Sequence, residues 1–171
     1  MALKQSVARL LIADDVGIGK TIEAGMILRE WLDRGLTDRF TVLCPPHLVD
    51  QWVSELAEKF DIDAVAVTSA RARGLERGLP TSQSLFEAYP YTVVSLDYIK
   101  ADSRRDEFAR ACPHFVIVDE AHACVRNERG KHQRFDLLQT LSADADRHLL
   151  LLTATPHSGD VEAFHKLLAL L

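Results

Sequence analysis

The chain has 171 residues, of which 47% are hydrophobic, 26% charged and 7% aromatic, a composition that indicates one globular domain and excludes a disordered chain. Twenty Lys and Arg against 25 Asp and Glu give a net charge of −5, which excludes nucleic-acid binding through overall positive charge but not through a local patch. No apolar run approaches the roughly 18 residues of a membrane span, no secretory signal opens the sequence, and three cysteines provide no disulfide framework, so we expect a cytoplasmic protein without a membrane partner.

Short apolar runs alternate with longer helical patterns along the chain. The predicted strands are Arg9–Ala13, Phe40–Cys44, residues 64–67, Tyr91–Ser95, Phe115–Val118 and residues 148–152. The predicted helices are Lys20–Asp33, residues 48–60, 104–112 and 131–142, and a C-terminal helix that Asp160 is placed to cap. Most strands are continuously apolar, as in strands covered on both faces, so the sequence predicts a three-layer α/β domain with a mostly parallel sheet. Residues 69–90 are predicted to form a long loop or a locally variable excursion.

The first motif, DDVGIGKT, lies between the first predicted strand and the first predicted helix. Gly17 and Gly19 allow a tight turn that aims backbone N–H groups at phosphate oxygens, and the helix N-terminus adds its positive dipole end. Lys20 can reach the β- and γ-phosphates of a nucleotide, and the Thr21 hydroxyl can ligate Mg²⁺. The residues of this predicted phosphate loop are Asp14, Asp15, Val16, Gly17, Ile18, Gly19, Lys20 and Thr21.

The loop departs in one position from the general pattern G-x-x-x-x-G-K-[ST], which has glycine where this chain has Asp14. Taken alone, the segment also fits a glycine-containing turn before a helix. Its position between a buried strand and an apolar helix favours the phosphate loop.

The second motif is FVIVDEAH, in which Asp119 and Glu120 follow a run of four apolar residues. In an open α/β sheet the ligand lies at the carboxyl ends of the strands, where both motifs should meet. Asp119 is predicted to hold Mg²⁺, and Glu120 to polarise the water that attacks the γ-phosphate. The alternative is a pair of solvated acidic residues after a strand, which the phosphate loop makes less favourable.

Other noticeable side chains are interpreted as structural. Trp31 and Trp52 lie at helical spacing among apolar residues and are predicted core residues. Cys44 ends an apolar strand and is predicted to be a small buried hydrophobe rather than a nucleophile. The arginines of residues 71–77 fit either a solvated loop or a DNA-facing patch.

Together these motifs resemble the first RecA-like lobe of superfamily-two helicases, and more narrowly the Swi/Snf-type DNA-dependent ATPases. The segments that carry the resemblance are DDVGIGKTIEAG (14–25), the DEAH box (119–122) and LLLTATPHSGD (150–160), which are most similar to bacterial RNA-polymerase-associated and DISARM-type members. That branch typically has an acidic residue in place of the first loop glycine, as at Asp14. The resemblance implies a RecA-like P-loop NTPase domain with ATP and Mg²⁺ as ligands and double-stranded DNA as a partner.

The resemblance also implies roles for three further segments. TVLCPPHLVDQW (41–52) resembles a motif that lies against DNA, which implies DNA contacts at Pro46 and His47, and VVSLDYIK (93–100) implies one near Ser95. HLLLLTATP (148–156) resembles the motif that couples hydrolysis to lobe movement, through Thr153 and Thr155. His122 resembles the histidine that senses this coupling.

Family motors have two RecA-like lobes, and the second supplies arginines that reach the γ-phosphate. We expect residues 1–171 to form the first lobe only, with a second lobe absent from this sequence and required as a partner for hydrolysis. The alternative is a truncated or split nucleotide-binding module without hydrolysis of its own. A P-loop NTPase unrelated to helicases is a third interpretation, and it predicts no stimulation by DNA.

Overall fold

The computed structural model describes residues 7–13, 19–100, 102–125, 132–153 and 161–171. One six-stranded sheet forms the centre, in the order β1-β6-β5-β2-β4-β3, and every pair of neighbouring strands is parallel. The strands are β1 (Arg9–Ala13), β2 (Phe40–Cys44), β3 (Val65–Val67), β4 (Tyr91–Ser95), β5 (Phe115–Val118) and β6 (His148–Thr153). The predicted α/β fold with a mostly parallel sheet is confirmed.

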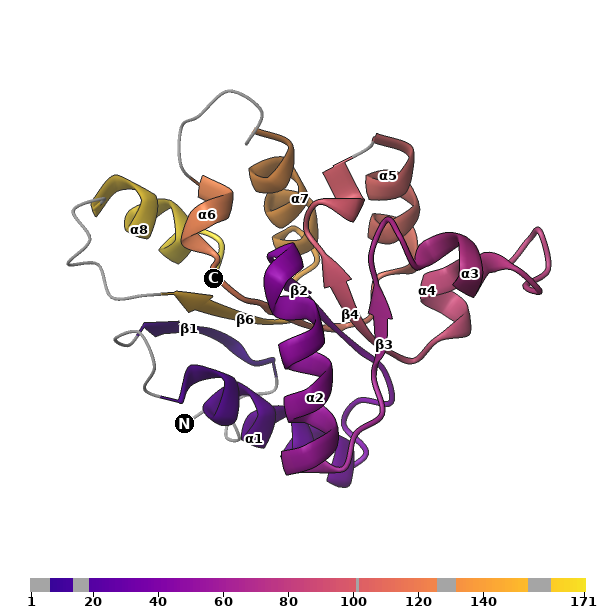
Figure 1. Ribbon diagram of the computed structural model, residues 1–171. Helices are drawn as coiled ribbons and strands as arrows, with labels where there is room; N and C mark the ends of the chain where they lie inside the picture. The colour runs from indigo at the N-terminus through magenta and orange to yellow at the C-terminus, as the bar shows by residue number, and fades with distance from the viewer. Residues whose placement is uncertain (1–6, 14–18, 101, 126–131, 154–160) are drawn as a thin grey trace.

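Helices cover both faces of this sheet, as the continuously apolar strands require. Figure 1 shows α1 (Lys20–Asp33) and α2 (Val49–Phe60) on one side, and α5 (Asp102–Ala111), α7 (His132–Ser142) and α8 (Val161–Leu168) on the other. The remaining short helices are η2 (Pro46–Leu48), α3 (Ala72–Glu76), α4 (Leu85–Ala88), η3 (Tyr98–Lys100) and α6 (His122–Val125). Of the helices in the described ranges, none has the length and apolar character that a membrane crossing demands.

The core is divided by the sheet into two clusters of buried side chains. The larger lies under α3 to α8, and the smaller lies under α1 and α2, where Trp31 and Trp52 are 3% and 2% exposed. The prediction that both tryptophans are core residues is confirmed. Gly25 is buried where α1 meets α2, and a Cβ there would lie 2.3 Å from the Phe60 ring, so a larger residue at this position would have to displace that ring.

The prediction of a long loop over residues 69–90 was wrong in part, because the segment contains α3 and α4. The Ser84 hydroxyl accepts the Phe86 N–H, and Glu87 accepts the Ser84 N–H at 2.9 Å, which completes a capping box at the start of α4. Leu85 and Phe86 then bury their side chains in the larger cluster. The predicted cap of α8, Asp160, lies outside the described residues.

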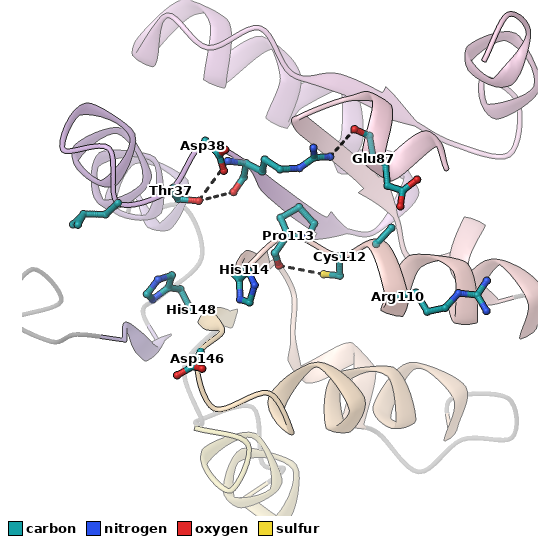
Figure 2. Close-up of a pocket in the computed structure, with 12 residues that line it drawn as sticks. Thr37, Asp38, Glu87, Arg110, Cys112, Pro113, His114, Asp146 and His148 are labelled. Carbon is teal, nitrogen blue, oxygen red and sulfur yellow. Dashed lines mark hydrogen bonds between the residues drawn. The ribbon is translucent and has the colours of Figure 1, made fainter. Parts of the chain in front are cut away.

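The amino-terminal edge of the sheet carries a buried histidine. The Nδ1 atom of His148 accepts the backbone N–H of Ala8 at 3.0 Å, and its ring packs on Trp31 with 4.1 Å between ring centroids. His148 also lines a polar pocket of about 500 Å³, beside His114 and Asp146 (Figure 2). Burial, and to a smaller extent the nearby His114, lower the pKa of His148. Protonation of Nδ1 would remove the acceptor for Ala8, so the folded chain holds this ring neutral.

We therefore expect the free energy of unfolding to depend on pH through His148. The unfolded chain binds this proton with a pKa of about 6.5, above that of the folded chain. The contribution is thus complete above about pH 6.5 and is lost as the pH falls through the lower pKa of the folded state. Urea unfolding between pH 5 and 8 measures the slope. His148→Asn keeps an acceptor without a titrating ring and should flatten the curve, and an unchanged slope in that variant would contradict the assignment.

Candidate functional site

All predicted site segments that the structure describes follow the carboxyl ends of strands. Because the strands are parallel, these ends lie at one edge of the sheet, opposite the edge that carries His148. In register, Ala13 at the end of β1 pairs with Thr153 at the end of β6, and Cys44 at the end of β2 pairs with Ser95 at the end of β4. The DEAH segment follows β5, which lies between β6 and β2. The site therefore draws on strands that are far apart in sequence.

The first part of the site is the start of α1. Gly19 has a φ of 72°, in the left-handed region that favours glycine, and its carbonyl accepts the Glu23 N–H at 2.9 Å. The N-cap residue Gly19 has no side chain and makes no side-chain cap hydrogen bond, and the N–H groups of the first turn point to the strand-end edge. Lys20 and Thr21 are half-buried in this turn. The predicted loop residues Asp14, Asp15, Val16, Gly17 and Ile18 lie outside the described residues.

The second part is the carboxylate of Asp119, which is 7% exposed. Its backbone N–H donates to the Leu43 carbonyl at 2.8 Å and so extends the β5–β2 ladder by one residue. Its Oδ1 accepts the Glu120 N–H at 2.8 Å, and its Oδ2 accepts the indole N–H of Trp52 at 2.8 Å. Within the described ranges two donors thus fix this buried carboxylate, and one acceptor site on each oxygen is left for a further ligand.

Glu120 has a φ of 52°, which is unusual for a residue other than glycine. The turn is held on its far side, where the Ala121 N–H donates to the Leu152 carbonyl of β6 at 2.9 Å. Backbone strain of this kind costs about 1–3 kcal/mol and persists only where the surrounding structure imposes it. Here the backbone bond of Asp119 to β2 and that of Ala121 to β6 hold the conformation of Glu120 from both sides. The chain turns out of the strand direction at Glu120, whose side chain is half-buried.

His122 connects the DEAH segment to the end of β6. Its Nδ1 lies 3.0 Å from the Thr153 hydroxyl oxygen and 3.3 Å from Glu120 Oε2. Thr153 is 2% exposed. An Nδ1–H ring can donate to either oxygen, so the imidazole can exchange between the two neighbours. The other predicted coupling residue, Thr155, lies outside the described residues.

Cys44 ends β2 next to this carboxylate but has no nucleophilic character. The side chain is fully buried, and burial, together with the charge of Asp119, raises the pKa of its thiol to about 12. A thiol with this pKa is protonated at neutral pH. The prediction that Cys44 is a small buried hydrophobe is confirmed.

The segments predicted to contact DNA lie at the same edge, after β2 and β4. Pro46 and His47 are exposed in η2, whereas Ser95 is 2% exposed and its hydroxyl accepts the Asp97 N–H at 3.2 Å. The exposed Arg71 pairs with Asp50 at 2.6 Å, which joins the start of α3 to the start of α2. Sequence reasoning missed the hydrogen bond from Trp52 to Asp119, because apolar spacing predicts burial of an indole ring but not the partner of its N–H group.

Comparison with known proteins gives a family match over the entire sequence. Residues 1–171 match the model of the SNF2-related domain. The chain is 34% identical over 169 residues to the RNA polymerase-associated protein RapA of Proteus mirabilis, and 35% identical over 164 residues to the uncharacterized ATP-dependent helicase YqhH of Bacillus subtilis. These matches cover 98% and 95% of this chain, but the chain spans only 17% and 26% of the two relatives.

Solved structures share the fold at lower sequence identity. The SWI2/SNF2 ATPase core of Sulfolobus solfataricus, solved in complex with double-stranded DNA, superposes with a TM-score of 0.69 at 18% identity, covering 95% of this chain and 31% of that one. The Hef helicase domain of Pyrococcus furiosus superposes with a TM-score of 0.64 at 19% identity, covering 97% of this chain and 33% of that one.

Proposed function

The chain belongs to the SNF2-related domain family as its first RecA-like lobe, and on that premise we propose that it binds ATP with Mg²⁺ at the carboxyl edge of its sheet. Hydrolysis follows when a second RecA-like lobe completes the site, and double-stranded DNA is the proposed partner. The observation that carries this proposal is the meeting of the α1 N-terminus with the Asp119–His122 segment at one edge of an all-parallel sheet.

The start of α1 fits a polyphosphate. Its first-turn N–H groups are donors at the positive end of the helix dipole, and its N-cap residue Gly19 makes no side-chain cap hydrogen bond. Among the described residues, no atom lies within 4 Å of a Cβ added at Gly19. The space and the donors both suit an anion. Lys20 is proposed to bind the β- and γ-phosphates. The residues that precede it are proposed to complete the phosphate loop; they are Asp14, Asp15, Val16, Gly17 and Ile18.

The environment of Asp119 fits Mg²⁺, because a buried carboxylate with free acceptor sites suits a hard cation or the water molecules that it carries. Asp119 and Thr21 are proposed to hold the ion, which when bound neutralises charge on the phosphate oxygens. Glu120 is proposed as the general base that orients and polarises the attacking water. The left-handed conformation of Glu120 turns the chain out of the strand direction directly after β5, which remains paired with β2 and β6.

His122, Thr153 and Thr155 are proposed to report the nucleotide state to the second lobe. The support for this is the position of His122 Nδ1 between Thr153 at the end of β6 and Glu120 beside the proposed water. A change in the hydrogen bonding of Glu120 would move the imidazole toward or away from Thr153. The segment that follows Thr153 would then receive the change.

Double-stranded DNA is proposed to contact Pro46 and His47, with Ser95 shaping the neighbouring loop through its bond to the Asp97 N–H. The support is that η2 is exposed at the strand-end edge, and that an ATPase core of the same fold has been solved with double-stranded DNA. A net charge of −5 means that this contact is local rather than spread over the surface.

Removal of the divalent ion gives the first test. ATP titrated into the 171-residue chain should bind at one site in the presence of Mg²⁺, and EDTA should weaken this binding at least tenfold, because Asp119 and the phosphates then repel each other. Titration calorimetry measures the affinity. Equal affinity with Mg²⁺ and with EDTA would contradict the proposed metal role of Asp119 and Thr21.

A further inference from the structure

The indole N–H of Trp52 donates to Asp119 Oδ2 at 2.8 Å, across 67 positions of sequence. We propose that Trp52 is a positioning residue, which holds the Asp119 carboxylate in the orientation that receives Mg²⁺. This inference rests on the proposed function, because it assigns a role to Trp52 only if Asp119 faces the metal.

The contact is built into the fold rather than formed on the surface. Trp52 is 2% exposed, and it belongs to the buried stripe of α2 together with Val49 and Leu56. A ring packed on all sides has one orientation, so its N–H group is a fixed donor. In contrast, a surface donor would follow the carboxylate as it rotates.

The Asp119 carboxylate is thereby held at both oxygens. Glu120 N–H holds Oδ1 and Trp52 Nε1–H holds Oδ2, and rotation of the carboxylate about its last bond would break both hydrogen bonds. The acceptor site that remains on each oxygen then points in a set direction. Partners behind a metal-binding group typically change metal affinity 10- to 100-fold when they are removed. Loss of the indole donor would leave the Glu120 N–H as the carboxylate's one hydrogen-bond donor in the part of the chain that the structure describes.

The chain provides a matched control in its only other tryptophan. Trp31 is 3% exposed and packs in the same cluster, but its Nε1 makes no hydrogen bond within the described part of the chain. Trp31→Phe and Trp52→Phe therefore remove the same atoms from the same core. Only Trp52→Phe removes a donor from Asp119.

The first experiment measures Mg²⁺ affinity. Mg²⁺ is titrated into the 171-residue chain with a fluorescent ATP analogue, at a temperature where circular dichroism shows each variant folded. We expect Trp52→Phe to raise the half-saturating Mg²⁺ concentration about tenfold or more. Trp31→Phe should change it less than twofold. Equal changes in the two variants would overturn the inference, because they would show a general effect of core packing.

The second experiment does not require Trp52→Phe to fold. In Trp31→Phe the single remaining indole N–H signal in the NMR spectrum belongs to Trp52. Mg²⁺ with ATP should shift this signal, and Asp119→Asn should shift it without ligand. A signal that responds to neither change would overturn the inference.

The proposed function and the inference fail in different ways. If ATP binding depends on Mg²⁺ and is lost in Lys20→Ala, but is the same in Trp52→Phe as in Trp31→Phe, the function stands and the inference falls. If the unmodified chain binds no ATP with Mg²⁺, both fall.

Discussion

Lys20→Ala is expected to weaken ATP binding about 100-fold, because it removes the proposed charge-assisted hydrogen bonds to the β- and γ-phosphates, which would together be worth about 3 kcal/mol. Lys20 stands in the first turn of α1, one residue after the left-handed Gly19. The backbone N–H groups of this turn would remain, so a weak affinity for phosphate should persist. Titration calorimetry with ATP and Mg²⁺ measures the change.

The control for this variant is Lys59→Ala. Lys59 is exposed on α2 and pairs with Glu55 at 3.2 Å, a surface ion pair whose loss costs at most about 1 kcal/mol of stability. It should keep the full ATP affinity, so that a loss specific to Lys20 reports on the site rather than on net charge. Equal affinity in Lys20→Ala and the unmodified chain would contradict the phosphate-loop assignment.

Two substitutions of Glu120 are expected to differ in stability but to be equally impaired in ATP hydrolysis. Glu120→Gln keeps the left-handed backbone and removes the proposed general base, so single-turnover hydrolysis in the presence of the second lobe should fall about 10²–10⁴-fold while ATP still binds. Glu120→Gly should be equally inactive. However, glycine adopts a φ of 52° without strain, so this variant should be about 1 kcal/mol more stable than Glu120→Gln.

Asp61 supplies the matched control for the backbone effect. It also has a left-handed φ, 55°, at the end of α2 and away from the proposed site. Asp61→Gly should gain similar stability in urea unfolding and leave hydrolysis unchanged. The account of Glu120 would be contradicted if Glu120→Gly were less stable than Glu120→Gln, or if either variant hydrolysed ATP at the unmodified rate.

Strands in this chain could be predicted almost to the residue, because a sheet covered on both faces demands continuous apolar runs. Phe40–Cys44 and Phe115–Val118 have their predicted bounds for this reason, since polar residues or proline end each run at once. Residues 69–90 were harder, because their glycines and prolines obscure helices of only four and five residues. The capping-box pattern of Ser84 and Glu87 was the available signal for α4.

The sequence predicts the position of those candidate site residues that directly follow a strand. Asp119 and Glu120 follow an apolar strand, and the parallel sheet brings them to the edge where α1 begins. Side-chain partners could not be predicted in the same way. The bonds of Trp52 to Asp119 and of His122 to Thr153 join residues 67 and 31 positions apart, and their geometry depends on the packing of α2 and β6 against β5.

The central claim is that this lobe binds ATP with Mg²⁺ and requires a second lobe to hydrolyse it. The most direct test is the rate of ATP hydrolysis by the 171-residue chain, measured with Mg²⁺ in the absence and presence of duplex DNA. Arginines supplied from a second lobe are worth about 10³–10⁵ in rate, so we predict negligible turnover in both conditions at ATP concentrations that saturate the site. Robust turnover that duplex DNA stimulates in these 171 residues alone would contradict the claim.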